Sequence, residues 1–130
     1  MNFRLKTTKQ TATILKNLHN STGLTPNILS RIAIALSLLD PEIPEYVNSE
    51  SEGLEFNRNT LTGEFDYIYK ALIKQHAGKD VPEEEYFPGL FNAHLERGVK
   101  LLENEYKHAG NFQKLLNNLI RLCDDNLEVK

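Results

Sequence analysis

The chain has 130 residues, of which 40% are hydrophobic and 25% charged, with a formal net charge of −3. These values are ordinary for a soluble globular protein with one core, so we expect a single domain over residues 1–130, and they exclude a generally basic, histone-like protein. The longest uninterrupted apolar run is only Ile32 to Leu36, and residues 1–9 lack the apolar centre of a signal peptide, which predicts a cytoplasmic protein with no membrane partner.

The first predicted element is a short strand within the first eight residues, where apolar and polar side chains alternate. Phe3 and Leu5 lie on one side of an extended chain, and Arg4, Lys6 and Thr8 lie on the other. Because so short a strand is not stable alone, it needs a partner strand, and the same strand of a second subunit is one candidate.

Two helices are predicted next. The first begins at about Lys9, with Thr8 as its N-cap, and stops at Gly23. The second runs from Pro26 to Leu39 after the N-cap Thr25. Nine of its 14 residues are apolar, and they lie on nearly all sides of the helix. A helix of this kind must be covered on most sides, so we expect a homo-oligomer, a dimer or a tetramer, in which a second subunit supplies part of the cover.

The segment 42–60 is acidic and rich in turn-forming residues, which predicts a connecting segment with a short extended piece at Leu54 to Phe56. Residues 61–123 are predicted to be the helical remainder. Its helices are expected at about 61–76, 89–108 and from an N-cap at Asn111 onward. The fold class is therefore mainly α, a single domain of about five helices with a short N-terminal strand.

Apolar residues recur at helical spacing in these helices. The helix at 89–108 is predicted to face inward with Phe91, Leu95, Val99, Leu102 and Tyr106. In the helix at 61–76 the predicted stripe is Phe65, Ile68, Tyr69, Leu72, Ile73 and His76. In the last helix it is Phe112, Leu116, Leu119, Ile120 and Cys123.

Catalytic and metal-binding signatures are missing from the sequence. The seven glycines never cluster into a phosphate-binding loop, and the four histidines show no H-x-x-x-H spacing. His94 and Glu96 form an H-x-E triplet, but a zinc deaminase also needs a downstream P-C-x-x-C, and Cys123 is the only cysteine. We therefore predict a protein that is not an enzyme, with no catalytic residues, metal or cofactor.

Two smaller features have a chemical and a structural interpretation. Cys123 could be a nucleophile or sulfur carrier, but its place on an apolar stripe predicts a buried, inert thiol. Glu64 and Asp66 could act as an acid–base pair or as magnesium ligands, but carboxylates are also typical of the first turn of a helix, which is the interpretation we favour.

The charge is distributed unevenly along the chain. Residues 1–39 contain five bases and no acid, a sum of +5, whereas residues 40–66 contain eight acids and one base, a sum of −7. A basic segment next to an acidic one is a known feature of proteins that contact nucleic acids, although uneven charge can also merely solvate a surface.

The order of strand, helix, Gly23, Thr25 and apolar helix over residues 3–39 resembles a ribbon–helix–helix DNA-binding unit. The resemblance implies that outward strand side chains, here Arg4, Lys6 and Thr8, read bases, and that the N-terminus of the second helix grips phosphate. We therefore predict double-stranded DNA as a partner. The predicted DNA-binding residues are Arg4, Lys6, Thr8, Lys9, Lys16, Thr25 and Asn27. The alternative is a dimerisation arm with no role in DNA binding.

A resemblance to one family extends over most of the chain. The segments that carry it are FRLKTTKQTATILKNLHNSTGLTPNILSRIAIALSL, GLEFNRNTLTGEFDYIYKALI and FNAHLERGVKLL. They look like the small DndE proteins of bacterial DNA sulfur-modification (phosphorothioation) systems. The resemblance implies a non-catalytic, DNA-associated partner of the larger sulfur-modification proteins, which replace a non-bridging phosphate oxygen by sulfur. The alternative is a structural adaptor that oligomerises and docks those proteins on its acidic segment without contacting DNA.

Overall fold

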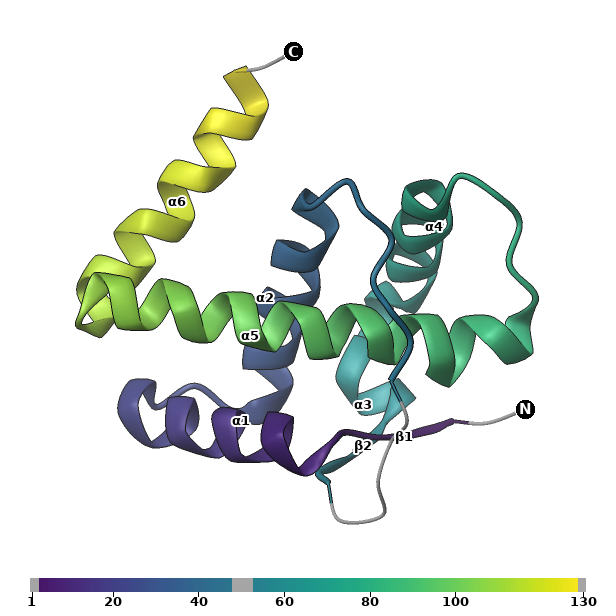
Figure 1. Ribbon diagram of the computed structural model, residues 1–130, viewed down its shortest axis with the longest axis horizontal. Helices are drawn as coiled ribbons and strands as arrows, with labels where there is room; N and C mark the ends of the chain where they lie inside the picture. Colours follow the sequence, from purple (N-terminus) through teal and green to yellow (C-terminus); the bar gives the residue numbers. More distant parts are fainter. Residues whose placement is uncertain (1–2, 48–52, 129–130) are drawn as a thin grey trace.

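The computed structural model describes residues 3–47 and 53–128, and these are mainly α-helical, as predicted (Figure 1). Residues 48–52 of the predicted connecting segment 42–60, including Glu50 and Glu52, lie outside the described residues. Short helical turns, η1 (Gly63–Phe65) and η2 (Glu85–Leu90), precede two of the longer helices. The helices are α1 (Lys9–Thr22), α2 (Pro26–Leu39), α3 (Arg58–Thr62), α4 (Asp66–Ala77), α5 (Phe91–Ala109) and α6 (Phe112–Glu128).

The N-terminal strand finds its partner inside the chain. Strand β1 (Arg4–Lys6) pairs antiparallel with β2 (Glu55–Asn57), and Leu5 lies opposite Phe56. Both of these side chains are buried, because they point from the two-stranded ribbon into the core. The strand pattern also allowed β1 to pair with its copy in a second subunit. In the structure β1 pairs within the chain instead. The weakly predicted extended piece at Leu54 to Phe56 supplies the partner.

Helices α1 and α2 begin and end at the residues that the sequence predicts. The hydroxyl of Thr8 accepts a hydrogen bond from the Thr11 N–H at 3.2 Å, and that of Thr25 accepts one from the Ile28 N–H at 3.3 Å. Gly23 ends α1 with φ at +79°, a left-handed conformation that glycine adopts at little cost. Local sequence alone therefore determines the boundaries of this unit.

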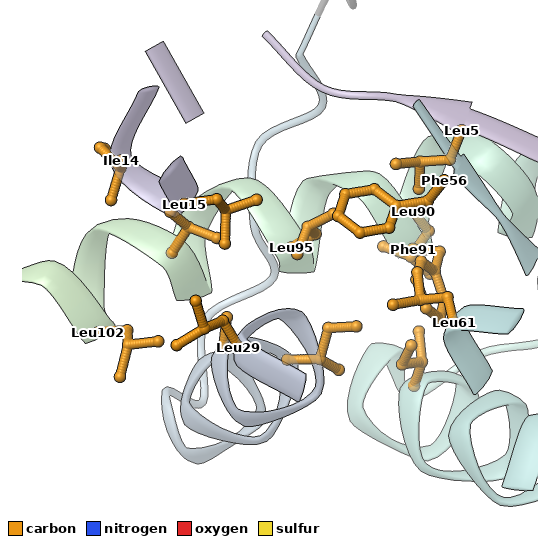
Figure 2. Packing of buried hydrophobic residues seen from close by; sticks show 14 of the residues in the cluster. Leu5, Ile14, Leu15, Leu29, Phe56, Leu61, Leu90, Phe91, Leu95 and Leu102 are labelled. Atoms are coloured by element: carbon orange, nitrogen blue, oxygen red, sulfur yellow. The ribbon is translucent and has the colours of Figure 1, made fainter. Parts of the chain in front are cut away.

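The core lies where α5 crosses the rest of the chain. The long helix α5 runs across α2, with α1 and the two-stranded ribbon beside it (Figure 1). Figure 2 shows leucines of α1, α2 and α5 meeting at this crossing, while Leu5 and Phe56 of the ribbon approach Phe91. Gly98 of α5 lies directly against α2, since a Cβ atom there would be 1.9 Å from the carbonyl oxygen of Ala33. The two backbones can approach so closely only because residue 98 has no side chain.

The helix predicted at 61–76 is broken in the structure. Gly63, with φ at +57°, separates α3 from η1 and α4, and the Asn57 side chain caps α3 by accepting from the Asn59 N–H. Only half of the stripe faces the core: Ile73 is buried, and Tyr69 and His76 are partly buried. The other three residues are exposed: Phe65, Ile68 and Leu72. The apolar spacing therefore marks a second face of α4 that this chain leaves uncovered.

Helix α6 begins as predicted, with the Asn111 side chain accepting from the Lys114 N–H at 2.9 Å, and then extends away from the other helices (Figure 1). Leu115 is buried, but Ile120 is 60% exposed and Cys123 is exposed, so the prediction of a buried thiol is wrong. The stripe has no core to enter, because α5 covers only the first turns of α6.

Among the described residues no single helix is long and apolar enough to cross a membrane. Only α1 and α2 taken together, bent by 111°, reach that length and composition.

Candidate nucleic-acid interface

The basic residues of the N-terminal third lie around β1, α1 and the first turn of α2. We call the surface formed by Arg4, Lys6, Lys9, Lys16 and Asn27 the N-terminal surface. Arg4, Lys9 and Lys16 are exposed, and Lys6 and Asn27 are partly buried. The fifth base of the segment, Arg31, has another role, since its guanidinium donates to the carbonyls of Thr60 and Leu61 at the end of α3.

Two adjoining grooves connect Lys16 to the start of α2. One groove of about 360 Å³ has Lys16 and His19 on the α1 side, and the other, of about 290 Å³, contains Asn27 and residues of β2. Pro26 and Leu54 line both grooves. The structure therefore brings Lys16 and Asn27, which are 11 positions apart, to one continuous surface beside the positive end of the α2 dipole.

An acidic residue lies within this surface. Glu55 of β2 stands opposite Lys6 in the ribbon, and its carboxylate accepts a hydrogen bond from Arg4 at 2.9 Å. The side chains of Arg4 and Glu55 are 66% and 45% exposed, so water and salt screen this ion pair, whose net stabilisation is about 0–1 kcal/mol. A phosphate group can therefore compete with Glu55 for Arg4 at small cost.

Thr8 and Thr25 use their side chains within the chain. Thr8 donates its hydroxyl and its backbone N–H to the two carboxylate oxygens of Glu96, at 2.9 and 2.8 Å, and Thr11 donates a third hydrogen bond to the same group. Glu96 is 3% exposed, and it attaches the junction of β1 and α1 to α5. Sequence reasoning missed this anchor, although a carboxylate beside Leu95 and Val99 on the inner face of α5 was a usable signal.

A second polar cluster, also missed from the sequence, joins α3, α4 and the segment before η2. The guanidinium of Arg58 donates two hydrogen bonds to Asp66, at 2.8 and 2.9 Å, and a third to Glu83 at 2.7 Å. Hydrogen bonds from Arg58 hold the pKa of Asp66 below its usual range, and Lys70 together with Arg58 does the same for Glu83. Asp66 is thus an ion-pair partner as well as a residue of the first helical turn, and its ionised state is fixed by Arg58.

Within the described parts of the chain, no group of three or more histidine, cysteine, aspartate or glutamate side chains could hold a metal ion. The chemistry that the N-terminal surface offers is instead that of a cationic, hydrogen-bonding surface. Such a surface attracts polyanions and positions them without a covalent step.

The comparison with known proteins points to one family. Residues 4–123 match the model of the family described as DndE, DNA sulphur modification protein. The crystal structure of DndE from Escherichia coli B7A, involved in DNA phosphorothioation modification, is 25% identical with a TM-score of 0.63, and 78% of this chain and 97% of that chain are covered. A glycine-to-lysine mutant of DndE, involved in DNA phosphorothioation, is 24% identical with a TM-score of 0.62, and 80% and 99% are covered. No protein of curated function matches the chain.

Proposed function

Because this chain belongs to the DndE family of DNA sulphur modification proteins, we propose that it is a non-catalytic subunit that holds duplex DNA for the other proteins of a phosphorothioation system. The observation that carries the proposal is the N-terminal surface. Its four bases come from a segment of 39 residues that contains no acid, and one of them, Lys16, lines a groove together with Pro26, the first residue of α2. The crystal structures of similar fold are of proteins involved in DNA phosphorothioation, which supports DNA as the ligand.

We expect most contacts to be with phosphates rather than bases. Three of the four basic residues are lysines, whose point charge suits the DNA backbone. The hydroxyls of Thr8 and Thr25 already cap helices, so they act in our proposal by fixing α1 and α2 in place. The N-terminus of α2 then offers backbone N–H groups to an anion. Sequence choice is then left to a partner protein.

The test is a variant in which Arg4, Lys6, Lys9 and Lys16 are all replaced by alanine. We expect its affinity for a DNA duplex to fall by at least tenfold, because phosphate contacts dominate such binding. Each lost contact should reduce the slope of log affinity against log salt by about 0.9. Mobility shift or fluorescence anisotropy at two salt concentrations measures both quantities.

A matched control removes the same charge from elsewhere on the surface. Lys100, Lys107, Lys114 and Arg121 are exposed on α5 and α6, and their joint replacement by alanine should leave duplex binding nearly unchanged. The proposal fails if the N-terminal variant stays folded and binds duplex with the wild-type affinity and salt slope.

We further propose that the protein acts as a homo-oligomer assembled through an apolar face on α2 and α4. The face consists of Ile28 and Leu39 of α2, Phe65 of η1, and Ile68 and Leu72 of α4, which are 39–58% exposed. Helices α2 and α4 touch one another, so these side chains belong to neighbouring elements. The same face favours the alternative function, an adaptor that docks other sulfur-modification proteins.

Ile68→Glu should convert the oligomer to a species of one subunit's mass, 14.9 kDa, because a carboxylate would then be buried between subunits. The variant should stay folded, since Ile68 is 53% exposed in one subunit. Sedimentation equilibrium at micromolar concentration measures the mass, and Ile120→Glu on α6 is the control. A wild-type protein that already sediments at 14.9 kDa contradicts the prediction.

A further inference from the structure

A groove of about 650 Å³ opens between the start of β1, α3 and α4. Phe3 lies at its edge, next in sequence to Arg4, so the groove adjoins the N-terminal surface. Its volume is that of a small-ligand site, in the range of about 300–1,000 Å³, and is too small to enclose a duplex.

One face of α4 supplies the principal side chains of the groove. Tyr67, Lys70 and Lys74 stand at positions i, i+3 and i+7, so they lie on the same side of the helix. Tyr67 is 88% exposed, which means that its ring contributes almost nothing to the core. Phe3, also lining the groove, is a second aromatic ring with 45% exposure.

The lining of the groove has a small excess of positive charge. Its lining contains three bases, Arg58, Lys70 and Lys74, and two acids, Asp66 and Glu83. Arg58 is fixed by both acids, and Lys70 pairs with Glu83, with the two side chains 36% and 29% exposed. Lys74 pairs at 3.3 Å with Asp80, whose side chain is 95% exposed. That pair is screened by water, so an incoming phosphate can replace Asp80 at Lys74.

We propose that this groove binds one unstacked nucleotide of a DNA strand, with its base on the ring of Tyr67 and its phosphate at Lys70 and Lys74. Aromatic rings beside a line of cations are the combination by which proteins hold single-stranded nucleic acid, because every base has a face that can stack. The inference rests on the proposed function in taking DNA as the ligand. It adds that the protein contacts a locally unpaired strand as well as the duplex.

The experiment measures the anisotropy of two labelled DNAs, an oligothymidylate of about eight nucleotides and a blunt duplex of about 20 base pairs. Tyr67→Ala should weaken binding of the oligothymidylate by about tenfold and leave duplex binding unchanged, and Tyr67→Phe should restore it, since stacking needs the ring and not the hydroxyl. Lys70→Ala with Lys74→Ala should weaken oligothymidylate binding and reduce its salt slope. Tyr46→Ala, which removes a half-exposed tyrosine outside the groove, is the control.

Three results would overturn the inference: no binding of oligothymidylate by the wild type, equal losses for Tyr67→Ala and Tyr46→Ala, or displacement of the oligothymidylate by thymidine monophosphate at an equal concentration. The last result would indicate a site for free nucleotides. The two proposals fail separately. Loss of duplex binding in the N-terminal alanine variant tests the proposed function, and loss of oligothymidylate binding in Tyr67→Ala tests the groove.

Discussion

Gly98→Ala is expected to lower the free energy of unfolding by about 3 kcal/mol and Tm by roughly 10 °C. An added Cβ atom at this position would lie 1.9 Å from the carbonyl oxygen of Ala33 and 2.3 Å from its carbonyl carbon. Both are backbone atoms of α2, so no side-chain rotation can relieve the contact, and α2 and α5 must move apart. Because these helices form the most extensive contact between elements of the chain, that movement opens the centre of the core.

The direction of the stability change in Gly98→Ala distinguishes an effect of packing from an effect of helix propensity. In the middle of an exposed helix, alanine stabilises by about 1 kcal/mol relative to glycine, so propensity alone predicts a gain at Gly98. Gly89→Ala is the matched control: its Cβ atom would lie 3.2 Å from a ring carbon of Tyr46, a half-exposed side chain that can move. Thermal or urea unfolding should show a large loss for Gly98→Ala and less than about 1 kcal/mol for Gly89→Ala. Equal changes at the two positions would mean that the α2–α5 contact is looser than described.

The parts of the fold that could be predicted are those whose signal is local. Thr8, Gly23, Thr25 and Asn111 determine helix ends through bonds to residues at most four positions away, and all four act as the sequence predicts. The partner of β1 could not be derived in this way. Thr7 and Leu54 exchange the hydrogen bonds that begin the ribbon, although 47 positions separate them. Two apolar residues in an acidic segment predict a short extended piece but do not indicate which strand it pairs with.

Apolar spacing on α4 misled because periodicity identifies an apolar face without saying what covers it. Ile73 faces the core of this chain, whereas Phe65, Ile68 and Leu72 face outward. The same limit applies to Cys123, whose stripe continues along α6 beyond the last contact with α5. An oligomer interface and a core produce the same sequence pattern, and only the position of the other helices distinguishes them.

The candidate site was predictable as a segment but not as a surface. The absence of acids before Asp40 marks the basic segment, and the structure gathers Lys16 and Asn27 around Pro26. The sequence could not indicate that Glu55 would lie beside Arg4, or that Glu96 would accept the hydrogen bond of the Thr8 hydroxyl, since both partners come from distant elements. The side chains of Thr8 and Thr25 therefore serve the geometry of the surface.

A buried histidine near the end of α2 makes stability depend on pH. His94 is fully buried, its Nδ1 lies 2.8 Å from the Ser37 hydroxyl, and its ring contacts His76 at a centroid distance of 4.9 Å. Arg97 donates to the same hydroxyl at 2.9 Å and pairs with Asp40. Burial, together with smaller contributions from the neighbouring His76 and Arg97, lowers the pKa of His94 to about 3. The folded protein therefore keeps this imidazole neutral, whereas the unfolded chain protonates it below about pH 6.5.

The free energy of unfolding should consequently fall by about 2 kcal/mol between pH 7 and pH 5. Because the pKa of His94 is lower in the folded protein, its contribution to stability is fully present at pH values above the pKa of histidine in the unfolded chain, about 6.5. This contribution is lost as the pH falls from about 6.5 toward 3, since only the unfolded state takes up the proton in that interval. Asp66 and Glu83, whose pKa values are also lowered, lose their contributions only below about pH 4.5, outside the interval from pH 7 to pH 5.

Urea unfolding at one protein concentration measures the change in stability between pH 7 and pH 5. His94→Gln should flatten this pH dependence, whatever its effect on stability at pH 7. His108→Gln, at an exposed histidine of the last turn of α5, should keep the wild-type dependence, and a His94→Gln protein with that same dependence would show that another group takes up the proton.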